Sequence, residues 1–258
     1  INNDSVEILI SNVEMGQGAQ TALRKIVATT LSIPIDSIIY TNPDTSRVPD
    51  SGPTVASRTT MIVGGLLEKA ALEMKERWNE SAAFEVSKVY KHPEHIQWDQ
   101  GKLAGDAYPT YSWGINVVEV EVDNLTLAVN VKKIWAVFDV GVAIDDRMMR
   151  GQIEGGIAQG LGYATIEVME TQNGRIQQNS MTDYTIPTAS DVPDIESKLV
   201  ENPYEFGPYG AKCAGELTLV GVAPALAAAV SNAIKTHVKV IPVTPEYLLK
   251  EIENENSV

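Results

Sequence analysis

The sequence is poor in cysteine and in positive charge. Cys213 is its only cysteine, so this chain by itself forms no internal disulfide and supplies the thiolates of neither an iron–sulfur cluster nor a cysteine-rich zinc site. This cysteine usage favours a reducing cytoplasm. The 34 acidic residues outnumber the 20 basic ones, for a net charge of −14. That balance argues against nucleic acid or an anionic membrane as a partner, because phosphate attraction needs a basic surface.

Long apolar runs and targeting signals are scarce as well. We expect no membrane partner, since no apolar run in the sequence approaches the length of a membrane span and no signal-peptide pattern opens it. The sequence starts without an initiator Met and almost inside a strand, which is typical of a processed subunit or of a domain within a longer chain. Its 258 residues, of which 44% are hydrophobic, are enough to bury a sizeable core.

The sequence does contain a regular succession of periodic segments, in which alternation predicts strands and helical spacing predicts helices. Strands are expected at about 5–13, 37–42, 115–123, 127–141 and 238–243, and helices from the GQGAQT segment to Pro34, at 56–79, 147–170 and 216–236, and from Pro245. This order mixes a hairpin with helical connections and favours an α+β fold of mixed sheets and packed helices.

The GQGAQT segment places Gly16 and Gly18 between a strand and a helix N-terminus. Glycines at such a turn let backbone N–H groups approach an anion, and the helix start favours negative charge. Gln17 between them adds a side-chain amide. A Gly-x-Gly turn is also common as a simple tight turn, and this one lacks both the Lys-Ser/Thr of a P-loop and the full dinucleotide fingerprint.

A second helix start, TVASRTT, gathers hydroxyl groups around one arginine. Its candidate residues are Thr54, Ala56, Ser57, Arg58 and Thr59. Hydroxyls with an arginine suit a phosphate, or a polar heterocycle with a phosphate tail. Ser57 alone is explained equally well as an N-cap.

The stretch GQIEGGIAQGLG puts five glycines into one expected helix, although each interior Gly costs about 0.8–1 kcal/mol relative to Ala. One helical face, at i, i+3, i+4 and i+7, carries Gln152, Gly155, Gly156 and Gln159. Two amides with bare backbone between them make a surface for a flat polar ligand. A tight contact with another helix or a sheet explains the glycines equally well.

Glu216 is a lone carboxylate at the start of an apolar helix. The helix N-terminus favours the charged form and burial favours the neutral acid, so the residue is either a general base or a capping acid. The pair His92 and His95 is a weak metal candidate, because Pro93 works against a helix between them and no Cys or acid cluster accompanies them. We therefore expect no metal held by protein side chains.

Together, the segments VEMGQGAQT, TVASRTT, FDVG with GQIEGGIAQGLG, and GAKCAGELTL resemble the molybdenum-cofactor subunits of the xanthine dehydrogenase/aldehyde oxidase family of molybdenum hydroxylases. They occur in the family's order, and the resemblance runs from the first residues to about 240. It implies that residues 1–258 form the C-terminal part of the molybdopterin-binding region. Within it we expect two intertwined α+β subdomains, at about 1–85 with 200–258 and at 86–199.

The resemblance also implies a role for each motif. The turns around Gln17 and Ser57 match segments that hold the pyranopterin and its phosphate or nucleotide tail, and Gln152 and Gln159 match glutamines that bond the pterin near the metal. Glu216 matches the family's catalytic glutamate, a general base in the water-derived hydroxylation of an N-heterocycle or an aldehyde. The implied cofactor is molybdenum with molybdopterin, expected in the cytosine dinucleotide form.

Several features of the family are not found in this sequence: an earlier Gly-Gly-Phe-Gly type loop, a glutamine near the metal, and a substrate-positioning arginine. The resemblance therefore implies a larger molybdopterin-binding subunit as partner, as in split enzymes such as nicotinate dehydrogenase, or an N-terminal half in the same chain. Iron–sulfur clusters and FAD are expected on partner chains. Reductive or CO-oxidising chemistry on the same fold, and a non-catalytic assembly module, remain alternatives. Cys213 is interpreted as a small packing residue.

Overall fold

The computed structural model describes residues 5–79 and 83–255, and these fall into two compact units. Unit 1 comprises residues 1–112, 139–149 and 201–214, and unit 2 comprises 113–138, 150–200 and 215–258. Each unit combines three separate stretches of sequence, and their bounds differ from the expected division into about 1–85 with 200–258 and 86–199. The C-terminal region lies in the same unit as 113–138, because the helix over 222–234 packs on the strand over 114–122.

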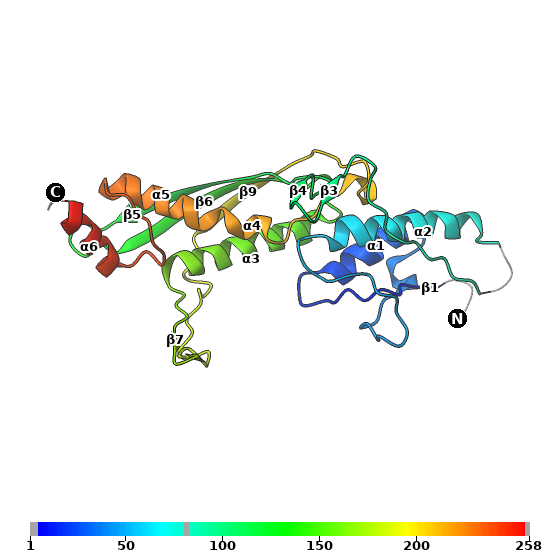
Figure 1. Ribbon diagram of the computed structural model, residues 1–258, viewed down its shortest axis with the longest axis horizontal. Coiled ribbons are helices and arrows are strands. Elements are labelled where there is room, and N and C mark those ends of the chain that lie inside the picture. Colours follow the sequence, from blue (N-terminus) through cyan, green and yellow to red (C-terminus); the bar gives the residue numbers. More distant parts are fainter. Residues whose placement is uncertain (1–4, 80–82, 256–258) are drawn as a thin grey trace. The chain divides into compact units, whose positions relative to one another are not determined.

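Unit 1 is built on two helices and a small parallel sheet (Figure 1). Strand β1 (Val6–Glu7) pairs in parallel with β2 (Ile38–Ile39), and helix α1 (Ala19–Leu31) packs on α2 (Gly64–Glu76). The strand expected over 5–13 is therefore much shorter, because only two of its residues have ladder partners. The core of this unit consists of Ile8, Ile10, Leu23, Ile26, Val27, Ala28, Leu31, Ile38, Val63 and Ala71.

The expected helix over 56–79 begins later than its periodicity predicts. Ala56 and Ser57 have φ values of 53° and 48°, a left-handed conformation that side chains with a Cβ adopt only at a cost. A π-helical turn, η2 (Thr59–Val63), follows and runs into α2. Unit 1 also contains the short 3₁₀ turns η1 (Ile35–Ser37) and η3 (Pro208–Gly210) and the hairpin of β3 (Trp98–Asp99) and β4 (Ala104–Gly105).

Unit 2 contains a three-stranded sheet in the order β5-β6-β9, formed by β5 (Gly114–Val122), β6 (Val129–Asp139) and β9 (Asp194–Val200). The expected hairpin of β5 and β6 is confirmed as an antiparallel pair with a bulge between Glu119 and Val120. Alternation along β6 buries Ile134, Ala136 and Phe138 on one face, as expected for a sheet covered on that side.

Helices α3 (Asp146–Thr165), α4 (Leu217–Val220), α5 (Val222–Ile234) and α6 (Pro245–Glu255) complete the structure. Helix α5 packs on β5 and buries Val222, Leu226 and Val230. The expected helix over 216–236 is interrupted at Gly221, and the strand expected at 238–243 does not form. The α+β expectation is confirmed.

The apolar stretch Leu217–Ile234 corrects the expectation that no segment approaches a membrane span. This helical stretch is long and apolar enough to cross a membrane, with a mean hydropathy of 1.8, and 22% of its residues are buried. In unit 2 its buried side chains pack against β5, which is the behaviour of a helix in a packed α+β layer.

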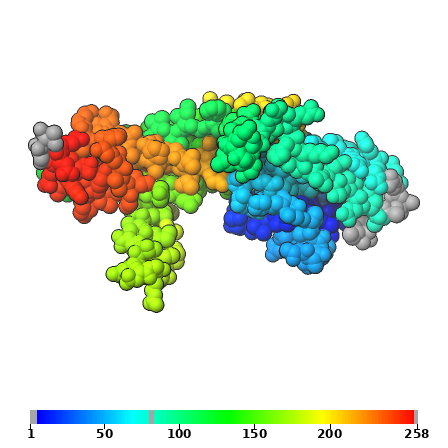
Figure 2. All heavy atoms as spheres, viewed as in Figure 1, coloured from blue at the N-terminus to red at the C-terminus, as the bar shows by residue number. Residues whose placement is uncertain are grey.

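A long exposed excursion follows α3 within unit 2. It carries the two-stranded hairpin of β7 (Thr171–Gln172) and β8 (Arg175–Ile176), and in Figure 2 it appears as the yellow-green lobe. Tyr184, in a turn after β8, connects the later part of this excursion to its beginning by donating a hydrogen bond to Glu167 Oε2 at 2.5 Å.

Candidate functional site

The N–H groups of the GQG turn are already occupied by a carboxylate from the chain itself. Glu14 Oε1 accepts hydrogen bonds from Gly16 N at 2.8 Å and Gly18 N at 3.0 Å, and Oε2 accepts one from Gln20 N at 2.9 Å. Burial alone would raise the pKa of Glu14, but these backbone donors outweigh it and the pKa is lowered. The anion expected at these amides is thus, in this structure, Glu14, a residue that the sequence analysis passed over.

Gln17 folds back onto its own loop. Its side-chain oxygen accepts a hydrogen bond from Met15 N at 2.7 Å, and its Nε2 donates to Val13 O at 3.0 Å. Gly16 and Gly18 have φ values of 102° and 82°, so both turn residues require the freedom of glycine. A Cβ on Gly18 would also lie 2.1 Å from Met148 Cε. The turn is therefore tightly specified in shape.

The second candidate turn uses part of its polar groups internally. Arg58 Nη1 donates to Ser51 O and to Pro53 O, each at 3.0 Å. Thr54 Oγ1 accepts from Val13 N at 3.0 Å, and Thr59 is buried. Ala56 is exposed and Ser57 is half-buried. The exposed residues of this turn are Val55 and the left-handed Ala56.

The glycine-rich face of α3 serves two purposes at once. A Cβ on Gly156 would lie 1.9 Å from Thr218 Oγ1, and one on Gly160 would lie 2.8 Å from Leu219 O, so these two glycines allow α4 to pack on the backbone of α3. A Cβ on Gly155 would meet nothing within 4 Å. Helix packing explains Gly156 and Gly160, whereas Gly155 needs another explanation.

Gln152 and Gln159 lie on the same side of α3 as Gly155, since residues i, i+3 and i+7 share a helical face. Gln152 is half-buried and Gln159 is exposed. Within the described part of the chain, no hydrogen bond occupies either side-chain amide. We call Gln152, Gly155 and Gln159 the α3 strip. It offers amide donors and acceptors on both sides of bare backbone.

Glu216 is the residue that precedes α4, and its side chain makes no capping hydrogen bond to that helix. Its backbone oxygen accepts from Leu219 N at 3.1 Å and Val220 N at 3.2 Å. The carboxylate is exposed. The capping role that the sequence left open is therefore not the one that the side chain performs.

The candidate residues fall into two groups, one in each unit. In unit 2, α3 and the start of α4 meet where Gly156 contacts Thr218, two residues after Glu216; Figure 1 shows α4 beside α3. In unit 1, the turns around Gln17 and Ser57 both contact the segment 11–14: Gln17 Nε2 donates to Val13 O, and Val13 N donates to Thr54 Oγ1.

A buried ion pair in unit 1 was not identified from the sequence. Lys212 Nζ lies 2.7 Å from Asp139 Oδ2 and donates to Tyr111 O at 3.0 Å, with side chains only 4% and 7% exposed. Burial would raise the pKa of Asp139, but hydrogen bonds from Lys212, Asn202 and Gly141 N lower it overall. The FDVG and GAKCAGE segments are thus joined by this pair.

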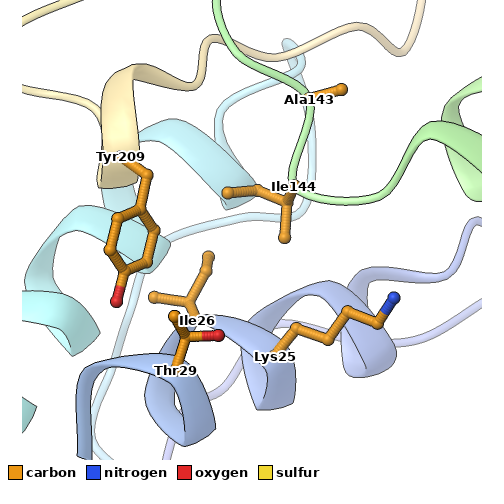
Figure 3. Close-up of a pocket in the computed structure, with 6 residues that line it drawn as sticks. All are labelled: Lys25, Ile26, Thr29, Ala143, Ile144 and Tyr209. Carbon is orange, nitrogen blue, oxygen red and sulfur yellow. The ribbon is translucent and has the colours of Figure 1, made fainter. Parts of the chain in front are cut away.

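A cavity of about 340 Å³ in unit 1 is lined by none of the predicted site residues. Figure 3 shows its walls, which are Lys25, Ile26, Thr29, Ala143, Ile144 and Tyr209. The ammonium of Lys25 pairs with Asp145, and the Tyr209 hydroxyl lies 2.6 Å from Thr30 Oγ1. Across residues 5–79 and 83–255, no three His, Cys, Asp or Glu side chains cluster so as to hold a metal ion.

Comparison with known proteins decides the family. The family model described as a molybdopterin cofactor-binding domain matches residues 1–103 and 83–193. The chain belongs to this family. The predicted resemblance to molybdenum-containing oxidoreductases of the xanthine dehydrogenase and aldehyde oxidase type is thereby confirmed.

Two curated relatives illustrate the kinship of this molybdopterin cofactor-binding domain. It is 26% identical to the xanthine dehydrogenase molybdenum-binding subunit of Escherichia coli, over 97% of the chain and 38% of the relative. It is 28% identical to the nicotine 6-hydroxylase large subunit of Paenarthrobacter nicotinovorans, over 95% of the chain and 35% of the relative. The domain thus spans little more than a third of the length of these relatives.

Solved structures confirm the fold. The aldehyde oxidoreductase from Desulfovibrio desulfuricans matches 97% of the chain and 29% of its own, with a TM-score of 0.85 and 28% identity. Quinoline 2-oxidoreductase from Pseudomonas putida matches 98% of the chain and 37% of its own, with a TM-score of 0.79 and 24% identity. The α+β fold is that of this region of the molybdenum hydroxylases.

The α3 strip fits a flat, polar cofactor such as a pterin. The open position at Gly155 is the space that any side chain there would fill, and the amides of Gln152 and Gln159 match the mixed donor and acceptor edge of a pterin ring. Because molybdopterin carries the metal through its own ligands, the lack of a side-chain metal cluster in the described residues is compatible with this fit.

Proposed function

We propose that this molybdopterin cofactor-binding domain holds part of a molybdenum cofactor and supplies Glu216 as the general base of a hydroxylation. The observation that carries the proposal is the α3 strip. Its open glycine costs helix stability, yet no packing contact within 4 Å accounts for it. A flat ligand that lies against the helix backbone would explain why glycine occupies position 155.

The binding roles divide between the two units. Gln152 and Gln159 would hold the pterin through their side-chain amides, with Gly155 leaving open space between them, and Gly156 lets α4 pack against the same helix. In unit 1, the phosphate or nucleotide tail, which we propose is the cytosine dinucleotide, would contact the surfaces of the turns at 16–18 and 54–59. It would not bind the N–H groups of Gly16 and Gly18, because Glu14 already accepts their hydrogen bonds. When bound, the molybdopterin cofactor supplies the molybdenum centre at which the substrate is oxidised.

Glu216 acts as the base. It is exposed and directly precedes α4. A carboxylate in this position is able to accept a proton from a water-derived nucleophile as that nucleophile attacks the substrate carbon. The two residues before it, Ala214 and Gly215, are small.

We propose an N-heterocycle or an aldehyde as substrate. The names of two similar proteins, nicotine 6-hydroxylase and aldehyde oxidoreductase, support these two classes. We further propose that the remainder of the cofactor region, the iron–sulfur clusters and the flavin lie on other parts of the enzyme. The coverage of little more than a third of each relative supports this division.

The test is the substitution Glu216→Gln in the complete enzyme, assayed with aldehydes and N-heterocycles and an artificial electron acceptor. We expect turnover to fall by about 10²–10⁴-fold, the contribution of a general base, with molybdenum and pterin content unchanged. The matched control is Glu154→Gln, which removes an exposed carboxylate from α3, two residues from Gln152 and away from the strip.

Three outcomes would count against the proposal. A Glu216→Gln enzyme that keeps most of its turnover would remove Glu216 from the chemistry. Cofactor loss in that variant, with residual turnover proportional to the molybdenum that remains, would assign Glu216 to binding. A wild-type enzyme with full cofactor and no turnover of either substrate class would contradict the proposed substrates.

A further inference from the structure

The extended segment Ser11–Glu14 contacts both of the unit 1 turns that we propose to hold the cofactor. Ser11 and Ser51 exchange hydrogen bonds, with Ser11 N donating to Ser51 Oγ at 3.1 Å and Ser51 N donating to Ser11 Oγ at 2.8 Å. Val13 N donates to Thr54 Oγ1 at 3.0 Å. The segment thus lies along the beginning of the 51–59 turn, held by side chains in place of a regular β-ladder.

Asn12 occupies the centre of this contact and is only 1% exposed. Its Nδ2 donates to Thr54 Oγ1 at 3.3 Å and to the more distant Gly52 O, Pro53 O and Thr59 Oγ1, each at 3.5 Å. One buried amide nitrogen therefore reaches oxygen atoms on both sides of the strained pair Ala56 and Ser57.

The side-chain oxygen of Asn12 has no comparable hydrogen bonds in the described part of the chain. Its Oδ1 is buried and has no hydrogen-bond partner within the described residues. A buried acceptor without a donor lowers stability, and an apolar side chain of similar size would avoid that penalty. Stability alone therefore gives a poor account of asparagine at this position, whereas orienting the 52–59 turn does account for it.

Glu14 makes the equivalent contact with the other turn. Residues 12 and 14 point to the same side of an extended segment, and the Glu14 carboxylate gathers the N–H groups of Gly16, Gly18 and Gln20 at 2.8, 3.0 and 2.9 Å. These bonds fix the turn that Gly16 and Gly18 make with positive φ values.

We propose that Asn12 and Glu14 are positioning residues for cofactor binding: from one short segment they fix the 52–59 turn and the 16–20 turn relative to each other. This inference rests on the proposed function for what the two turns bind. Asn12 is buried, and the Glu14 carboxylate accepts three backbone hydrogen bonds. Each residue would therefore affect the cofactor through the turn that it holds, without contacting the cofactor itself.

The test uses Asn12→Asp, Asn12→Ala and Glu14→Gln in the complete enzyme. Asn12→Asp keeps the shape of the side chain but removes its donor, so Gly52 O and Pro53 O, which can only accept, lose their hydrogen bond from residue 12. We expect molybdenum and pterin content per folded chain to fall roughly 10-fold. Losing residues that orient metal ligands lowers metal affinity by about that factor or more. Amide exchange of the cofactor-free protein should accelerate at 52–59 in the Asn12 variants and at 16–20 in Glu14→Gln.

Two control variants separate positioning from stability. Thr30→Val removes a buried hydroxyl of unit 1 that bonds Ile26 O at 2.8 Å and faces Tyr209. Glu7→Gln removes a carboxylate from the same stretch of chain, where it pairs with Arg47 at 2.9 Å. We expect both controls to keep the cofactor content of the wild type, even where thermal stability falls.

The results distinguish this inference from the proposed function. Full cofactor content in Asn12→Asp and Glu14→Gln, or a loss no greater than in Thr30→Val at equal thermal stability, would overturn the positioning role. If the wild-type enzyme itself contains no molybdenum or pterin, the proposed function fails. The exchange measurement then still decides the structural part, because unchanged protection of both turns in the variants would overturn it.

Discussion

The ion pair between Lys212 and Asp139 is the most deeply buried charge interaction among those described, and it links two segments that are far apart in sequence. Lys212 also donates to Tyr111 O, and Asp139 also accepts from Asn202 Nδ2 at 2.8 Å and Gly141 N at 3.0 Å. Every charged atom thus has additional hydrogen bonds, the condition under which a buried pair is tolerated. The pair anchors the segment that leads to Glu216 along the chain.

Lys212→Met should be strongly destabilising. It would leave Asp139 buried without its countercharge, and we expect the free energy of unfolding to fall by about 3–5 kcal/mol. Chemical unfolding followed by circular dichroism measures this. The matched control is Lys132→Met, which breaks the exposed pair with Glu121 and should leave stability almost unchanged. Equal effects of the two substitutions would contradict the role given to the buried pair.

The same pair predicts a pH dependence with a definite sign. Because the pKa of Asp139 is lower in the folded protein than its ordinary value of about 3.9, its contribution to stability is fully present above that value. It is lost as the pH falls through the folded pKa.

The sequence shows Lys212 and Asp139 but gives no sign that they form a pair, since 73 positions separate them.

At the scale of elements, two neighbouring glycines of α3 differ in their surroundings: Gly156 is packed against α4, whereas Gly155 faces open space. A Cβ on Gly156 collides with Thr218, whereas one on Gly155 meets nothing. The sequence predicted the shared face and left ligand binding and helix packing equally open. The structure shows that packing explains Gly156 and Gly160 but not Gly155. Periodicity could not separate these cases, because it identifies a face and not what covers each part of it.

Three alanine substitutions test this division. Gly156→Ala should destabilise the protein by about 1–3 kcal/mol through overpacking. Gly155→Ala should stabilise folding by up to about 1 kcal/mol through helix propensity, yet lower molybdenum and pterin content. The control Glu154→Ala changes an exposed position of α3 about 100° around the helix from Gly155, and it should leave the cofactor content unchanged. Thermal unfolding with metal analysis measures both effects, and full cofactor in Gly155→Ala would contradict the strip.

Other elements show where local sequence reasoning reaches its limit. The β5–β6 hairpin was predictable because alternation persists over its whole length. The start of η2 was not, since the left-handed Ala56 and Ser57 carry no glycine to mark the turn. The role of Glu14 was also missed, although the residue directly precedes the GQG turn, because a carboxylate beside glycines does not reveal which amides it will bond.

At the scale of the whole molecule, the chain passes repeatedly between two units. Helix α3 and strand β6 each contribute residues to both, so no single cut in the sequence separates them. Composition and periodicity predicted the fold class and the order of most elements. The bounds of the units depend on which helix packs on which strand, as α5 does on β5, and such long-range pairing is not encoded in local periodicity.

One measurement tests the account most directly: molybdenum and pterin per copy of this chain in the enzyme purified from its natural source. A family match over residues 1–103 and 83–193, together with the open α3 strip, predicts one molybdenum and one pterin per chain. Native mass spectrometry should also find the rest of the cofactor region, in the same chain or on a partner subunit. An intact complex that contains this chain but neither molybdenum nor pterin would contradict the central claim.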